Sequence, residues 1–151
     1  MKQTPQELAV QAKMQPGMLT HQGFLGEDDR HYHEIIADDL ETLEKLGISA
    51  EAVADKLETL AAQAFEADGY PVRVDEKFEV SYQSFRGKIA CPFPHPGVYG
   101  KGEITIKNLG NQKELKFTPL NIHLIREHGF FEGKGSAHRL EPQMCWEVLW
   151  K

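Results

Sequence analysis

The sequence predicts a single α+β domain in which a helical amino-terminal half packs on a small antiparallel sheet. Apolar residues recur at helical spacing through residues 28–67, whereas apolar and polar residues alternate in short segments after residue 71. A chain of 151 residues suits one domain whose core needs no disulfides. We therefore expect one domain, 1–151, with a helical half (1–70) and a β-rich half (71–151).

A short helix is predicted first, with Thr4 as its cap and Pro5 in its first turn. A longer helix over residues 28–46 ends at Gly47, and Ser49 caps a further helix over residues 50–67. The short joint predicts a helical hairpin. The longer helix is expected to bury one stripe of apolar side chains, namely Tyr32, Ile35, Ile36, Leu40, Leu43 and Leu46.

The second half alternates as strands do, and it ends in two short helices. Strands are expected at 71–74, 78–85, 103–107 and 114–117, the last two joined as a hairpin. Thr118 and Pro119 then open a helix that Gly129 closes. An aromatic carboxyl-terminal segment, residues 143–150, completes the predicted core as a short helix.

Four residues form the most specific chemical pattern in the chain. Cys91 and His95 read Cys-x3-His in a proline-rich loop, and His123 and His128 read His-x4-His on the predicted helix. Zinc is bound by thiolate and imidazole groups at similar spacing, in the same order of loop, hairpin and helix. The sequence therefore predicts a zinc site in a ββα-like unit, residues 91–128, with these four residues as metal ligands.

Each predicted ligand also has a simpler explanation. Cys91 can be a small buried apolar residue, and His95 can shape a rigid loop. His128 can be favoured at the helix end by the helix dipole. Residues five apart lie about 140° apart around a helix, which turns His123 away from His128 unless the last turn is distorted.

A second candidate site lies in the glycine-rich loop of residues 129–136 and just beyond it. Lys134, His138 and Arg139 could bind an anion or another small ligand together with glycine amides. Nucleotide binding is disfavoured because this loop follows a helix, whereas a phosphate loop leaves a strand and opens a helix.

Charge is unequal between the halves. Residues 1–70 carry five basic and fourteen acidic side chains, whereas residues 71–151 carry twelve basic and nine acidic ones. Either the two surfaces simply differ in sign, or the acidic half contacts the basic one or another subunit. Six of these twelve basic residues are those through which the β half could bind nucleic acid, namely Arg73, Arg86, Lys88, Lys101, Lys107 and Lys116.

Composition predicts a cytoplasmic protein without a membrane span. The first residues lack a secretion signal, no long apolar run is present, and two distant cysteines do not make a disulfide framework. One disulfide between Cys91 and Cys145 stays an alternative to a reduced environment.

Three functional hypotheses follow, and the sequence does not decide whether the protein is an enzyme. The first is a non-catalytic structural or protein-association role, as a homodimer or with another protein, with zinc as the possible cofactor. The second is a small-molecule enzyme or binding protein with a pocket between the 91–96 and 130–139 loops. The third is nucleic-acid binding through the basic β half, which the acidic helical half disfavours.

Overall fold

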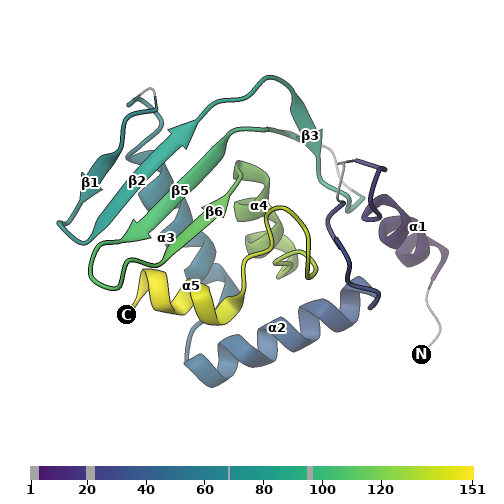
Figure 1. The fold of residues 1–151 in the computed structure, drawn as a ribbon. Coiled ribbons are helices and arrows are strands. Elements are labelled where there is room, and N and C mark those ends of the chain that lie inside the picture. Colours follow the sequence, from purple (N-terminus) through teal and green to yellow (C-terminus); the bar gives the residue numbers. More distant parts are fainter. Residues whose placement is uncertain (1–3, 20–22, 68, 95–96) are drawn as a thin grey trace.

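The computed structural model describes residues 4–19, 23–67, 69–94 and 97–151, and it confirms the predicted α+β fold. Within these residues the helices are α1 (Pro5–Lys13), α2 (Tyr32–Leu46), α3 (Ala50–Ala62), α4 (Pro119–His128) and α5 (Pro142–Leu149). The strands are β1 (Val72–Val74), β2 (Phe78–Gln83), β3 (Lys88–Ala90), β4 (Val98–Gly100), β5 (Glu103–Asn108) and β6 (Glu114–Phe117). Figure 1 shows their arrangement.

Four strands form the main sheet, in the order β1-β2-β5-β6, and all neighbours are antiparallel. The predicted hairpin of residues 103–117 is confirmed as β5–β6. Its turn is stabilised by Asn108, whose side-chain oxygen accepts hydrogen bonds from the Gly110 amide at 2.8 Å and the Asn111 amide at 3.2 Å. This local bonding holds the two strands in register.

Helices α3 and α5 pack on one face of this sheet (Figure 1), so the strands alternate between buried apolar and more accessible polar residues. The buried face of the strands packs with α3 and α5 into the larger apolar core. Its sheet residues are Phe78, Val80, Ile104, Ile106, Leu115 and Phe117.

The joint between α2 and α3 follows the predicted chemistry. Gly47 has a φ of 76°, a conformation that glycine adopts without strain, and the Ser49 hydroxyl accepts a hydrogen bond from the Ala52 amide at 3.0 Å. After this turn the two helices pack on different elements: α3 packs on α4, and α2 contacts α5. The carboxyl-terminal helix therefore links α2 to the sheet.

Three details of the helical half differ from the sequence prediction. Helix α2 begins at Tyr32 rather than near residue 28, because the His31 ring nitrogen accepts a hydrogen bond from the His33 amide and so caps the helix there. Leu40, predicted to be inward, is 41% exposed, while Asp39 beside it is buried. Phe65 lies beyond the end of α3 and is 44% exposed.

Helix α4 matches its sequence prediction at both ends. The Thr118 hydroxyl accepts a hydrogen bond from the Asn121 amide, the Asn121 side chain accepts one from the Thr118 amide, and Pro119 occupies the first turn. Gly129 ends the helix with a φ of 63°. These caps fix where His128, the last helical residue, lies.

A second, two-stranded sheet was not predicted. Strands β3 and β4 pair antiparallel, with Ala90 opposite Val98. Each strand has only three residues, too few for alternation to distinguish it from a loop. The pairing is important because the two strands bracket residues 91–97, the loop that carries Cys91.

A smaller apolar cluster lies on the α1 side of the molecule. Its buried members from the amino-terminal half are Val10, Met14, Phe24, Leu25, Tyr32 and Ile35. Its other buried members are Cys91, Leu120, Leu124 and Phe130. The predicted zinc ligand Cys91 is thus part of the surface on which the amino-terminal segment packs.

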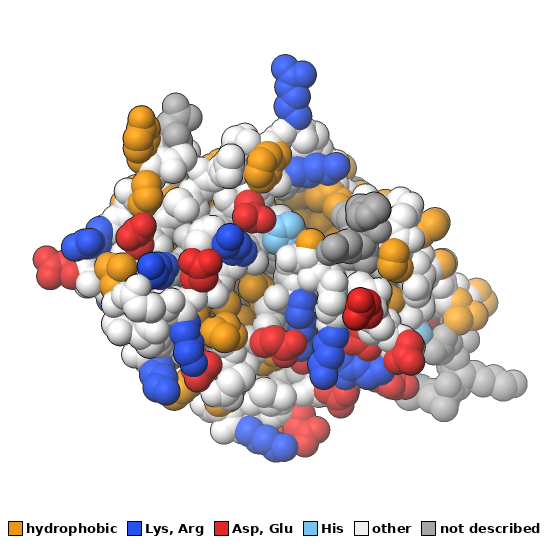
Figure 2. All heavy atoms as spheres, viewed as in Figure 1, with side chains coloured by type: hydrophobic (Ala, Val, Ile, Leu, Met, Phe, Trp, Pro, Cys, Tyr) orange, Lys and Arg blue, Asp and Glu red, His pale blue; other side chains and the backbone are white. Residues whose placement is uncertain are grey.

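Arginines of the β-rich half pair with carboxylates of the helical half. Arg126 bonds Asp55 and Glu58 at 2.8 and 3.1 Å on the surface. Arg139 forms a buried pair with Asp39. On the face shown in Figure 2, acidic and basic side chains are intermixed. Some of the excess acidic side chains of the helical half are therefore paired with arginines of the β-rich half within the chain.

Candidate metal centre

The structure brings three of the four predicted zinc ligands together. One ligand atom from each of Cys91, His123 and His128 lies within 4.8 Å of the other two, and this group could hold a metal ion. Cys91 is buried and the two histidines are half-buried. The fourth predicted ligand, His95, lies outside the described residues.

Two structural units supply these side chains. Cys91 directly follows β3, in the loop that the β3–β4 pairing closes. His123 lies within α4 and His128 is its last residue. Strand β4 also contacts α4, so the small sheet lies against the helix that carries both histidines.

The distance between Cys91 and His128 suits a shared metal ion. Their Sγ and Nε2 atoms are 3.7 Å apart. Zinc–sulfur and zinc–nitrogen bonds of about 2.3 and 2.0–2.1 Å, at a tetrahedral angle, place such atoms about 3.6 Å apart. The measured distance is therefore close to one edge of a zinc tetrahedron, although it also fits a weak hydrogen bond between the thiol and the imidazole.

The unfavourable helical spacing of the histidines does not keep their rings apart. The ring centroids of His123 and His128 are 5.2 Å apart, and the ring planes meet at 76°. Both rings approach Cys91, so the five-residue spacing is compatible with one common site at this helix end.

Two aromatic rings that sequence reasoning did not assign to the site pack against the histidines. Phe93 stacks on His128 with a centroid distance of 3.8 Å and an interplanar angle of 9°. Tyr99 of β4 stacks on His123 at 4.8 Å. The sequence signal that could have assigned Phe93 and Tyr99 to the site is their position on either side of His95, in the same short segment. These stacks restrict the orientation of both imidazoles.

Burial raises the pKa of the Cys91 thiol, with a smaller opposing effect from a hydrogen bond to the Phe93 backbone. A metal ion would bind the thiolate, so binding would release a proton and weaken at low pH. One thiolate with imidazoles is a donor set that zinc accepts readily. The residues present therefore fit zinc.

Two of the predicted anion-binding side chains, those of Arg139 and His138, have partners on the chain, whereas Lys134 is bonded through its backbone amide. The Arg139 guanidinium donates hydrogen bonds to the carboxylates of Asp39 and Glu141, the latter at 3.1 Å, and to the Glu132 carbonyl oxygen at 2.7 Å. The His138 ring lies 2.9 Å from a Glu103 carboxylate oxygen. The Lys134 amide donates to Asp28 at 3.2 Å. An anion at Arg139 would have to compete with these carboxylates. The anion-binding site of Lys134, His138 and Arg139 stays a prediction.

Glu132 is a buried carboxyl group close to this network. Its Oε2 accepts a hydrogen bond of 2.6 Å from the Asn121 side chain. Burial raises the pKa of Glu132 to about 7, against the opposing effects of the Asn121 hydrogen bond and the Arg139 charge. The folded protein thus holds this proton more tightly than the unfolded chain does.

We expect Glu132→Gln to remove a pH dependence of stability. A raised pKa in the folded state gives a contribution that is complete below the ordinary value of 4.5 and is lost as pH rises through about 7. The wild type should lose about 3 kcal/mol of unfolding free energy over this range relative to the variant. Urea denaturation at pH 5 and pH 8, both with chelator, measures the difference. Parallel pH profiles for the two proteins would contradict the expectation.

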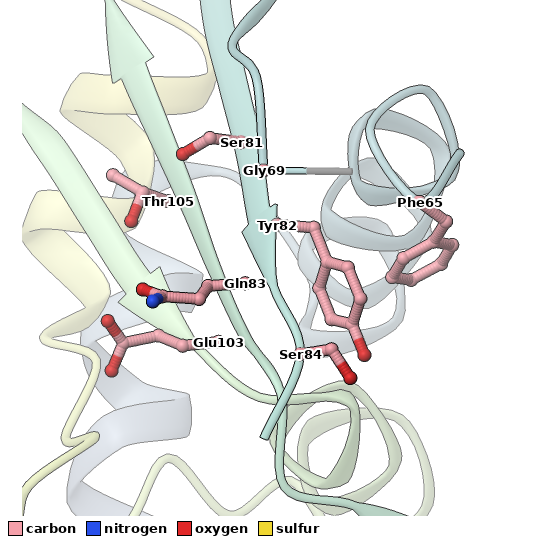
Figure 3. Close-up of a pocket in the computed structure, with 8 residues that line it drawn as sticks. All are labelled: Phe65, Gly69, Ser81, Tyr82, Gln83, Ser84, Glu103 and Thr105. Carbon is pink, nitrogen blue, oxygen red and sulfur yellow. The ribbon is translucent and has the colours of Figure 1, made fainter. Parts of the chain in front are cut away.

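A separate pocket of about 680 Å³ lies where β2 continues past its pairing with β1. Figure 3 shows Ser81, Gln83, Glu103 and Thr105 projecting to one side of the sheet, and Tyr82 projecting towards Phe65 on the other. The rings of Phe65 and Tyr82 meet edge to face at 4.9 Å. Since its described lining contains no cysteine or histidine, this pocket is distinct from the metal centre.

No family model, curated protein or solved structure gave a significant match to the chain. Among the residues that the structure describes, no helix is long and apolar enough to cross a membrane. Function is therefore inferred from the geometry of the Cys/His group.

Proposed function

We propose that this protein binds one zinc ion through Cys91, His123 and His128, and that the ion has a structural role. The observation that carries the proposal is the convergence of three ligand atoms within 4.8 Å of one another. Bound zinc holds the loop after β3 against the end of α4. Aromatic packing by Phe93 and Tyr99 on the two imidazoles supports a site whose function is to fix structure.

His95 is the proposed fourth ligand. This assignment rests on the Cys-x3-His spacing from Cys91, because His95 lies outside the described residues. Four protein ligands make a closed tetrahedral site, which is the arrangement typical of structural zinc.

The proposal is tested by measuring bound metal in untagged protein. Elemental analysis should find one zinc per chain in the wild type and none in His128→Ala, because the variant lacks an imidazole ligand. Competition with a chromophoric chelator should show an affinity loss of more than about 100-fold. The matched control is His138→Ala, which removes a histidine outside the group and should keep its zinc. Folded wild-type protein that binds no zinc when zinc is supplied, or equal zinc in both variants, would refute the site.

A second candidate is a zinc centre with an open position for a small molecule. The observation that favours it is a pocket of about 320 Å³ lined by His123 together with Tyr99, Arg126 and Glu127. A zinc-bound water at an open position would be acidified to a pKa of about 7, and Glu127 could then accept its proton.

Cobalt substitution separates the two candidates. The visible spectrum of cobalt-loaded wild type should not change when acetohydroxamate is added, since a closed site has no position for it. His95→Ala should open that position and make the spectrum respond. A response in the wild type would favour the small-molecule site instead.

A further inference from the structure

We propose that zinc occupancy controls whether α1 is docked on the rest of the protein. The inference rests on the proposed zinc site and extends it to the amino-terminal segment. A continuous series of contacts between described residues joins the two places, and Phe93 is its central member.

Phe93 contacts both the site and the start of α2. One face of its ring is stacked on His128 at 3.8 Å. Its ring also meets Tyr32 edge to face, at 5.3 Å and 89°. Phe93 lies two residues after Cys91, so a metal ion bound to Cys91 and His128 would fix the segment that carries it.

Tyr32 connects this segment to α1 through Gln11. The Tyr32 amide donates a hydrogen bond of 2.9 Å to the Gln11 side-chain oxygen, and the Gln11 amide group donates to the Arg30 carbonyl at 3.3 Å. Val10 and Met14 are buried in the same apolar cluster as Cys91. The docking surface of α1 therefore includes a metal ligand and the chain around it.

Helix α1 depends on these contacts because it is short. It has nine residues, and helices of that length are marginal in water without tertiary packing. Leu8 on its other side is 52% exposed. Apart from the cluster and Gln11, α1 is joined to α2 by the pair of Glu7 and His33 at 2.6 Å, where both side chains are partly exposed and the pair is weak.

The chain that follows α1 has its own support and should stay in place. The Gly133 amide donates to the Phe24 carbonyl at 2.7 Å, and the Glu27 amide donates to the Lys134 carbonyl at 2.9 Å. Residues 24–28 are thus held by backbone bonds that do not involve the metal ligands. The Met14 carbonyl, just after α1, accepts hydrogen bonds from the Phe24 and Leu25 amides at 2.9 and 3.2 Å, so Met14 should stay with that segment. Loss of zinc should release residues 5–13 selectively.

Hydrogen exchange followed by mass spectrometry tests whether zinc controls the docking of α1. It is measured on the full chain in zinc-loaded and chelator-stripped forms, and bound zinc is determined in the same samples. Amides of residues 6–13 should exchange about tenfold faster or more after stripping, whereas residues 24–28, β2 and β5 should change little. Tyr32→Ala should retain zinc and show fast exchange of α1 in both states. The matched control is Tyr82→Ala, which removes a similar edge-to-face contact, with Phe65, and should leave the zinc dependence of α1 intact.

The outcomes separate the two proposals. Protein that binds zinc but protects α1 equally in both states overturns the coupling and leaves the zinc site standing. Loss of protection in β2 and β5 as well would show that zinc supports the whole fold, which also overturns a selective release of α1. Wild-type protein that binds no zinc overturns both.

Discussion

Replacing Arg139 with methionine should lower the free energy of unfolding by about 3–5 kcal/mol, which is the usual cost of leaving a buried charge without its partner. The side chains of Arg139 and Asp39 are only 7% and 8% exposed. The substitution leaves the Asp39 carboxylate buried without its cation and removes the donor to the Glu132 carbonyl. Urea denaturation at neutral pH, with chelator present for both proteins, gives the value.

Arg126→Met is the matched control, because Arg126 also joins the two halves through two carboxylates. Its partners Asp55 and Glu58 are 62% and 61% exposed, so the expected cost is below about 1 kcal/mol. Pairing Asp39→Leu with Arg139→Met should cost less than the sum of the single changes, since no charge is then left unpaired. Equal costs for Arg126→Met and Arg139→Met would contradict the role given to burial.

Zinc should raise the free energy of unfolding by about 4 kcal/mol when free zinc is a thousandfold above its dissociation constant. The reason is mass action, since the ligands converge in the folded chain but not in the unfolded one. For a chain of this size the melting temperature should rise by roughly 10 °C. Denaturation in zinc buffers and in chelator gives both quantities.

Specificity of this stabilisation is checked with the ligand variants. Cys91→Ser and His128→Ala should gain little from zinc, and magnesium should not stabilise the wild type, because thiolate and imidazole are poor magnesium ligands. An equal gain from zinc in His128→Ala would mean that the ion acts elsewhere on the chain.

Local chemistry made much of the fold predictable. Ser49, Thr118 and Pro119 mark helix starts through their own side chains, and Gly47 and Gly129 mark helix ends through their backbone freedom. The β5–β6 hairpin has the turn residues and the alternation that it needs. Each of these signals lies within a few residues of the feature it determines.

Features that depend on distant partners could not be predicted. Asp39 is buried and Leu40 is exposed because α2 meets Arg139, a residue 100 positions away. The position of the Phe93 ring could not be predicted either, because it depends on contacts with His128 and Tyr32, which are distant from it and from each other in the sequence. Spacing predicted the three residues that meet, Cys91, His123 and His128, but not the rings that stack on the two imidazoles.

The proposed zinc ligands close a long loop of the chain. Cys91 and His128 are 37 residues apart, and β4, β5 and β6 lie between them. Closing a loop of that length in an unfolded chain costs about 4 kcal/mol of chain entropy, a cost that has already been met once these strands and α4 have formed. Zinc that binds this finished structure would act mainly by slowing its opening rather than by speeding its assembly.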